Sequence, residues 1–303
     1  MSAPAFSPHA AHSSVTPDLA RSVWRAGEPV SSFVYFAPER FAAYADIGLE
    51  PKVMGYFAAR SAAMGAVGAD TVAAVFSSFN PAVVRMVIPK AWSIASPETV
   101  VAARLTAVDK GLRAVLDPAV LAGPEIAEAA ELARTAASAA APLGHSRPLF
   151  AAHAGLDWPT EPHLVLWHAV TLLREFRGDG HLAALLFAGL DPLEASVTYA
   201  GTGERDVRWL LKSRGWAREQ WDDAVGRLRD RDIVARSDAE TVVLTDRGRS
   251  IRAELEDRTD VLSLPPFEAI GVAGCARLIE LLAPVKAAIV AAGLVPGPRK
   301  AAG

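Results

Sequence analysis

Apolar residues recur at spacings of three and four from residue 18 onward, the pattern of amphipathic helices. A short polar residue followed by proline marks several helix starts, because the polar side chain accepts hydrogen bonds from free amides and proline lacks only an unused N–H. These start signals are Asn80-Pro81, Ser96-Pro97, Asp117-Pro118 and Asp191-Pro192. The pattern predicts a mainly α-helical chain. Residues 1–17 and 296–303 lack the periodicity and are expected to be flexible tails.

Two pairs of segments resemble each other at nearly the same offset along the chain. Residues 41–45 (Phe-Ala-Ala-Tyr-Ala) resemble residues 150–154, and residues 73–81 resemble residues 184–192. This recurrence predicts a tandem duplication. It divides the chain into an N-terminal unit over 18–142 and a C-terminal unit over 143–295. An alanine-rich helical composition shared by both halves is the alternative explanation.

The C-terminal unit carries the alternation of a small β-hairpin after two predicted helices, over 204–212 and 217–230. Residues 233–236 and 241–245 alternate around the turn residues Ser237-Asp238, and a further helix follows from about residue 247. Helix, helix, hairpin and helix is the order of a winged helix-turn-helix. In the N-terminal unit a helix begins at Ser96, but another helix starts at Asp117 where the hairpin would stand, so this copy is expected to be degenerate.

Residues 225–236, followed by Val243-Leu-Thr-Asp-Arg-Gly-Arg249, resemble the helix, wing and "LT-x-x-G" pattern of MarR-type regulators. Trp167-His168, residues 177–181 (Arg-Gly-Asp-Gly-His) and residues 213–216 (Ser-Arg-Gly-Trp) extend the likeness to an actinobacterial family of MarR-like helix-turn-helix proteins. The resemblance covers roughly residues 41–282. Since that family is named for its fold, it implies a fold more specifically than a function.

MarR-type proteins are generally dimers whose terminal helices pack together. The resemblance, combined with the predicted duplication, therefore implies an internal pseudo-dimer built from two winged-helix units. Residues 125–141 and 273–292 are the expected packing helices. The protein is then a monomeric pseudo-dimer or a homodimer.

The charge balance excludes a general attraction to nucleic acid or to anionic membranes. The chain has 31 Lys and Arg against 34 Asp and Glu, a net charge of -3. The single cysteine, Cys275, excludes an internal disulfide, and no apolar run is long enough to span a bilayer. We expect a cytoplasmic protein with no membrane partner.

DNA is a candidate partner that the local charge disfavours. Five arginines could contact phosphates, namely Arg218, Arg227, Arg236, Arg247 and Arg249. The start of the predicted recognition helix, however, carries Glu219, Asp222 and Asp223, and a DNA-binding surface is normally basic. A solvated helix face paired with neighbouring carboxylates is the competing interpretation.

Polar side chains are concentrated between His168 and His181, in otherwise apolar surroundings. His168 and Glu175 share a helix face, and residues 178–180 (Gly-Asp-Gly) are expected to end that helix. Asp179 would then cap a following helix, at whose N-terminus His181 stays neutral near pH 7. His168, His181 and Glu175 are the candidates for acid–base catalysis. Their spacing matches no standard zinc motif, so no metal site is predicted.

The predicted duplication places Tyr56, Phe57 and Arg60 opposite this polar stretch. We therefore expect a ligand pocket at the junction of the two units, for a small organic molecule that is aromatic or anionic. Its expected residues are Tyr56, Phe57, Arg60, Trp167, His168, Arg174, Glu175, Arg177 and His181. MarR-like proteins commonly bind effectors at such a junction, and the resemblance implies the same here.

Three functions remain open from the sequence, and no cofactor is identified. The first is a ligand-binding protein that acts as a transcriptional regulator. The second is an enzyme on a repurposed winged-helix scaffold, with the histidines as acid or base. The third is a structural protein in which Arg174, Glu175, Arg177 and Asp179 only form an ion-pair network that joins the two copies.

Overall fold

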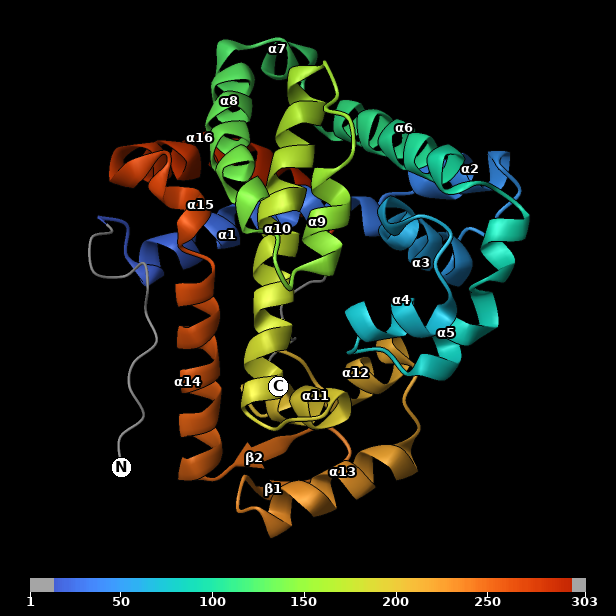
Figure 1. Cartoon of the computed structure of the whole chain (residues 1–303), viewed down its shortest axis with the longest axis vertical. Coiled ribbons are helices and arrows are strands. Elements are labelled where there is room, and N and C mark those ends of the chain that lie inside the picture. Colours follow the sequence, from blue (N-terminus) through green and yellow to red (C-terminus); the bar gives the residue numbers. More distant parts are fainter. Residues whose placement is uncertain (1–13, 296–303) are drawn as a thin grey trace.

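The structure is a computed structural model that describes residues 14–295. Within this range the chain is mainly helical, with one two-stranded antiparallel sheet, which confirms the predicted class. Figure 1 shows most helices gathered at one end of the long axis and the sheet with α13 at the other. Residues 1–13 and the predicted C-terminal tail lie outside the described residues.

The N-terminal elements begin at the polar-proline signals seen in the sequence. Asn80 accepts a hydrogen bond from Ala82 N and Ser96 accepts one from Thr99 N, so both are N-caps. The helices are α1 (Pro17–Ser32), α2 (Glu39–Asp46), α3 (Val53–Ser61), α4 (Ala69–Val75), α5 (Pro81–Val87), α6 (Pro97–Val115), α7 (Pro118–Leu121) and α8 (Pro124–Ala140). Short 3-10 turns lie at Phe33–Tyr35, Ala62–Met64, Lys90–Ser93 and Ala141–Leu143.

A short helix, α9 (Pro148–Ala154), leads to the long central helix α10 (Pro162–Phe187). Helices α1, α6, α8, α9 and α14 all pack against α10, which runs down the middle of the molecule (Figure 1). Because α10 is surrounded, most of its residues are buried, including the polar His168, Glu175 and Asp179.

Helix α10 continues through residues 178–180, so the expected break at this Gly-Asp-Gly sequence is wrong. The small residues serve close packing instead: a Cβ atom added to Gly180 would lie 2.8 Å from the guanidinium of Arg147 and 3.3 Å from Leu262. Packing on several sides thus outweighs the low helix propensity of glycine.

Asp179 caps a helix, but not the one expected from the sequence. Its carboxylate accepts a hydrogen bond from the backbone N–H of Phe150 at 2.9 Å, near the start of α9. His181 consequently lies inside α10 rather than at a helix N-terminus. The expectation that a helix dipole acts on His181 is wrong.

The lower part of the molecule follows the predicted order of helices and hairpin. Its elements are α11 (Pro192–Ala200), α12 (Val207–Arg214), α13 (Arg218–Asp230), β1 (Val234–Ser237), β2 (Val242–Leu244) and α14 (Asp246–Leu262). The strands pair antiparallel, with Arg236 opposite Val243. The buried face of α13 consists of Trp221, Ala224, Val225 and Leu228.

The chain ends with α15 (Pro265–Glu268) and α16 (Gly271–Ala291), which packs against α1 and α8. Two apolar clusters hold the fold. The larger joins residues 15–176 to residues 264–289, and the smaller lies within residues 184–255. Helix α10 contributes to both, so it is the physical link between the lower part and the rest. None of the described helices has the length and apolarity needed to cross a bilayer.

Candidate functional site: a polar cleft along helix α10

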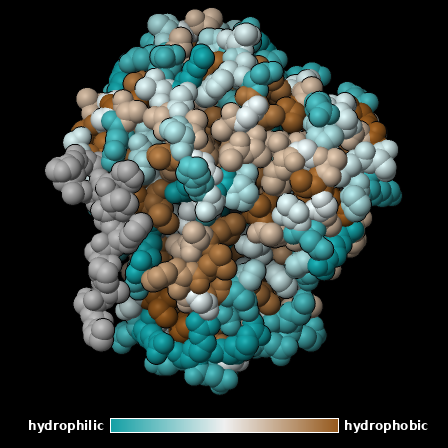
Figure 2. Space-filling view, viewed as in Figure 1, coloured by the Kyte–Doolittle hydropathy of each residue, from teal (hydrophilic) through white to brown (hydrophobic). Residues whose placement is uncertain are grey.

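A cleft of about 1040 Å³ lies along the middle of α10. Helices α1, α3, α11, α12 and α14, together with residues 75–78 and Leu149, contribute its other walls. Apolar lining comes from Leu182, Leu185 and Leu210, among the charged groups described below. On the face shown in Figure 2, apolar residues gather across the middle of the molecule and hydrophilic ones border them at the lower end.

Glu175 lies between two arginines at one side of the cleft. Arg174 Nη1 is 2.8 Å and Arg60 Nη2 is 3.2 Å from Glu175 Oε1. Burial alone would raise the pKa of Glu175, but the two guanidinium groups lower it to about 2. The carboxylate is therefore ionised and already paired, which makes it unsuitable as a general base near neutral pH.

The two arginines have further partners that fix their positions. Arg174 Nε pairs with Glu28 of α1 at 2.9 Å. Arg60 Nη1 donates to the hydroxyl oxygen of Tyr56 at 2.9 Å, and its guanidinium lies 4.4 Å from the centre of the Phe76 ring. Of the four residues predicted to form an ion-pair network, Arg174 and Glu175 pair with each other, and they connect α10 to Glu28 of α1 and Arg60 of α3.

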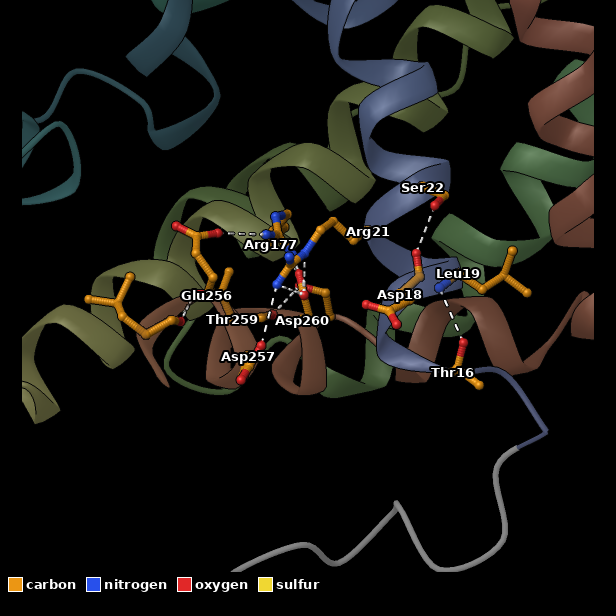
Figure 3. Close-up of polar contacts among 12 residues, drawn as sticks. Thr16, Asp18, Leu19, Arg21, Ser22, Arg177, Glu256, Asp257, Thr259 and Asp260 are labelled. Carbon is orange, nitrogen blue, oxygen red and sulfur yellow. Dashed lines mark hydrogen bonds and ion pairs between the residues drawn. The ribbon is translucent and has the colours of Figure 1, made fainter. Parts of the chain in front are cut away.

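Arg177 belongs to a second ion-pair cluster, which ties α1, α10 and α14 together (Figure 3). Its Nη1 lies 2.6 Å from Asp260 Oδ1, and the other oxygen of Asp260 pairs with Arg21. Glu256 completes the set at 3.4 Å from Arg177 Nη2. Asp260 is 1% exposed, so it holds two cations in a dry position.

His181 is the one candidate histidine that lines the cleft. Thr259 Oγ1 donates its hydrogen to the carbonyl of Leu255, so it accepts from His181 Nδ1 at 3.0 Å. This pairing fixes the proton on Nδ1 and leaves the lone pair on Nε2. Burial, together with Arg252 and Arg177, lowers the pKa of His181 to about 4. The ring is therefore neutral at pH 7, as expected, although for a different reason.

Asp179 also lines the cleft, one turn after Glu175 on α10. Burial raises the pKa of its carboxyl to about 6, although the amide of Phe150 favours the charged form. The group is thus close to titrating at neutral pH while it caps α9.

Three residues expected in the pocket lie in the core instead of lining the cleft. Phe57 packs among Tyr56, Phe76 and Phe79. The other two, Trp167 and His168, are buried on α10.

The contacts of these two residues explain their place in the core. Trp167 Nε1 donates to the carbonyl of Ser31 at 3.3 Å. His168 meets the ring of Trp158 edge-on, with 4.8 Å between ring centres. Burial and the nearby Arg104 lower the pKa of His168 to about 4, so it is a neutral core histidine.

His168, Glu175 and His181 do not converge on a common point, since each has a separate set of neighbours. Within residues 14–295, no three His, Cys, Asp or Glu side chains form a group that could hold a metal ion.

Sequence reasoning missed several residues that line the cleft, namely Trp24, Tyr199, Arg214, Arg252 and Glu256. They come from four helices, and nothing in their local sequence marks them as neighbours. Only Arg214 carried a signal, because it stands in the Ser-Arg-Gly-Trp stretch that contributed to the family resemblance. Six of the nine residues expected in the pocket line the cleft, namely Tyr56, Arg60, Arg174, Glu175, Arg177 and His181.

A profile of the helix-turn-helix family matches residues 20–296. The chain belongs to this family. The matched range extends far beyond α12 and α13 and includes nearly all residues of both apolar clusters. No curated protein and no solved structure matches the chain.

The helix-turn-helix protein holds the start of α13 against a segment from the N-terminal half. Asn80 N donates to Arg214 O at 2.9 Å, and Asn80 Nδ2 lies 3.2 Å from Gln220 Oε1. Trp216 Nε1 donates to the carbonyl of Ser78 at 2.9 Å. The segment 78–80 therefore covers the turn between α12 and α13.

Most of the arginines expected to contact DNA are engaged within the chain. Arg227 pairs with Asp191 at 2.5 Å and with Glu194 at 3.0 Å, and Arg249 pairs with Asp246. Arg218 Nη2 donates to the carbonyl of Ala239 at 3.2 Å.

Arg236 and Arg247 are the exceptions. Both side chains are exposed, and no carboxylate of residues 14–295 pairs with either of them. Any phosphate contact from this set is therefore expected at the hairpin and the start of α14.

Proposed function

We propose that this protein is a ligand-responsive regulator, in which a small organic molecule in the cleft controls the access of DNA to α13. The observation that carries the proposal is the composition of the cleft wall. Arg60 and Arg174 come from the upper helices, while Leu210 and Arg214 come from α12, directly before the turn to α13. A molecule bound between these walls contacts the upper helices and α12 at once. It can therefore shift the equilibrium between two positions of α12 relative to the upper helices.

The segment 75–80 supplies a route from the cleft to α13. Val75, Phe76, Ser77 and Ser78 line the cleft, and Asn80 lies next to them in the chain. The same segment holds the start of α13 through its contacts with Trp216 and Gln220. Helix-turn-helix proteins contact base edges with the N-terminal residues of the recognition helix. The protein would therefore cover this end of α13 until the ligand moves the segment.

The proposed fold is a MarR-like winged helix that occurs twice in the chain. The order α12, α13, hairpin and α14 supports a winged helix of the MarR-like kind. Helices α2, α3 and α5 precede α9, α10 and α11 at nearly the same offset, which supports the tandem duplication and the boundary near residue 142. Arg277 of α16 pairs with Glu128 of α8 at 2.7 Å, as expected of packing helices in a pseudo-dimer. Such a regulator would act in the cytoplasm, as a monomer or a homodimer.

The experiment is a measurement of DNA binding by the full chain and by the Asn80→Ala variant. Fluorescence anisotropy with fragments of genomic DNA at fixed salt would report the affinity. Removal of the hydrogen bonds to Gly215 and Gln220 should strengthen DNA binding by up to about 30-fold, since two hydrogen bonds of about 1 kcal/mol each are lost.

The control is Asp117→Ala. Asp117 caps α7 by accepting from Ala119 N at 2.7 Å, as Asn80 caps α5, but it lies outside the segment 75–80. This variant should leave DNA binding unchanged. Equal affinities for the wild type and Asn80→Ala would remove the support for gating. If neither protein shows salt-sensitive binding to DNA, the proposal that the protein is a transcriptional regulator is contradicted.

An acid–base enzyme in the same cleft is the second candidate, and His181 is the observation that favours it. Its Nε2 lone pair is available, because Thr259 fixes the proton on Nδ1. Incubation of the protein with a ligand found to bind, followed by mass spectrometry of that ligand, separates the two functions. A regulator returns the ligand unchanged, whereas an enzyme converts it and loses this ability in His181→Gln.

A further inference from the structure

Seven arginines line the cleft, and five of them already have carboxylate partners. Arg21, Arg60, Arg174, Arg177 and Arg252 each pair with an Asp or Glu. Arg25 and Arg214 have no such partner among residues 14–295, and Arg25 is exposed. The half-buried Arg214 is therefore the place where the cleft carries positive charge without a counter-charge.

The position of Arg214 is fixed by its surroundings. It stands at the end of α12, and its guanidinium lies 4.5 Å from the centre of the Phe79 ring and 5.3 Å from that of Trp209. Burial, with Arg60 and Arg174 close by, lowers its pKa below the usual arginine value. The cation is thus held on aromatic faces in a region where the protein supplies a positive potential.

The groups around Arg214 also define the shape of a partner. Tyr56 accepts a hydrogen bond from Arg60, so its own hydroxyl hydrogen remains available as a donor. The rings of Tyr56, Phe76 and Tyr199 line the same cleft. A cation, a hydroxyl donor and flat apolar walls suit an aromatic ring that carries an acidic group.

We propose that Arg214 anchors the carboxylate of an aromatic monocarboxylic acid, whose ring lies among Tyr56, Phe76 and Tyr199; this rests on the proposed ligand-binding function of the cleft. A guanidinium forms two parallel hydrogen bonds with a carboxylate. Within the described part of the chain, Arg214 is a single half-buried cation without a carboxylate partner, and it matches one negative charge. A phosphate monoester, which carries a charge of about -1.5 to -2 near pH 7, is a poorer match.

The other arginines of the cleft have a structural role. Arg60, Arg174 and Arg177 are among the residues expected in the pocket, but Glu175, Glu28 or Asp260 neutralises each of them. These three arginines shape the cleft and hold its walls together.

The test uses four probes that share a size and differ in charge or ring: 1-naphthoate, the neutral 1-naphthamide, 1-naphthyl phosphate and decalin-1-carboxylate. Calorimetry with the full chain measures each affinity. We expect 1-naphthoate to bind tightest. The Arg214→Met variant should bind 1-naphthoate about 10- to 100-fold more weakly than the wild type, since hydrogen bonds to charged groups are worth about 1.5–3 kcal/mol. Its affinity for 1-naphthamide should be unchanged.

Two further variants show whether weaker binding comes from the loss of the Arg214 guanidinium or from unfolding. Arg208→Met removes an exposed arginine of the same helix, paired with Glu240, and should bind all probes like the wild type. Arg214→Lys keeps the charge but loses the paired hydrogen bonds, so its affinity for 1-naphthoate should fall between those of the wild type and Arg214→Met. The melting temperature of each variant reports whether it is folded.

The outcomes separate this inference from the proposed function. Equal binding of naphthoate and naphthamide, or naphthoate binding that survives Arg214→Met, would overturn the role of Arg214 while the cleft remains a ligand site. If 1-naphthyl phosphate binds more tightly than 1-naphthoate, the ligand's acidic group is not a carboxylate. If decalin-1-carboxylate binds more tightly than 1-naphthoate, the ligand's ring is not aromatic. If none of the four probes binds, the role of Arg214 as a carboxylate anchor is contradicted. If no compound of a broad library of neutral and charged fragments binds either, the proposed ligand-binding function is contradicted as well.

Discussion

Arg60 of α3 and Glu175 of α10 are 115 positions apart in the chain, yet their side chains meet at 3.2 Å with only 9% and 5% of their surfaces exposed. Arg174 binds the same carboxylate oxygen. Glu175 thus lies between the buried Arg60 and the half-buried Arg174, and the junction between α3 and α10 depends on its charge.

Glu175→Gln should lower the free energy of unfolding by about 3 kcal/mol, because it leaves the buried guanidinium of Arg60 without its carboxylate partner and removes one of the two carboxylates that pair with Arg174. Urea denaturation at pH 7 measures the change. Asp70→Asn is the control: it breaks the exposed pair with Arg85, in which the Arg85 and Asp70 side chains are 60% and 81% exposed, and should cost less than about 1 kcal/mol. Similar losses of stability in the two variants would contradict the buried role of Glu175.

Asp260→Asn should loosen α14 from α1 and α10, since Asp260 is the carboxylate that Arg21 and Arg177 share (Figure 3). Hydrogen exchange followed by mass spectrometry should show that the variant exchanges faster than the wild type in α14 but not in α6. Asp257→Asn serves as the matched variant, because Asp257 lies 3.6 Å from Arg21 and is 78% exposed. The prediction fails if α14 exchanges equally in both variants.

His168 should make the protein less stable as the pH falls below 6.5. Its pKa is lowered to about 4 in the folded state, while an unfolded histidine has a pKa of about 6.5. The unfolded state therefore binds more protons between these values, and stability is present above pH 6.5 and lost as the pH falls toward 4.

The share of His168 in this loss should be about 2 kcal/mol between pH 8 and pH 5. Urea titrations at the two pH values should show that His168→Gln loses less stability than the wild type by this amount. His145→Gln, at an exposed position, should behave like the wild type. A His168→Gln variant with unchanged pH dependence would show that the buried ring does not stay neutral.

Arg236→Ala with Arg247→Ala should weaken DNA binding uniformly across sequences, because phosphate contacts carry no base information. The slope of log affinity against log salt should fall by about 2, roughly 0.9 for each phosphate that is no longer neutralised. Arg113→Ala provides the comparison, since Arg113 lies on α6 and pairs with Asp109. An unchanged slope in the double variant would place the DNA surface elsewhere.

The local features of the fold were readable from the sequence. Polar-proline pairs such as Asn80-Pro81 and Asp191-Pro192 begin helices because their chemistry acts within one turn. The apolar face of α13 and the alternation of β1 and β2 depend likewise on neighbours in the chain. The polar residues concentrated between His168 and His181 lie on α10, and several of them line the candidate site.

The tertiary structure decided the features that depend on distant residues. Helix α10 continues through Gly180 because Arg147 and Leu262 pack against it, although glycine by itself disfavours a helix. Asp179 caps α9 because α9 folds back against α10. Local propensity cannot anticipate either contact.

The same limit applies to the charges of the cleft. An arginine's sequence position does not reveal whether a carboxylate will reach it, and Glu175, Glu28 and Asp260 reach theirs only through packing. Arg214 is left without one for the same reason. The sequence by itself determined the helices, the hairpin and the cluster of polar groups, because these follow from short-range hydrogen bonding and apolar spacing. The tertiary structure decided which charge remains available to a ligand, because electrostatic pairing depends on distance in space.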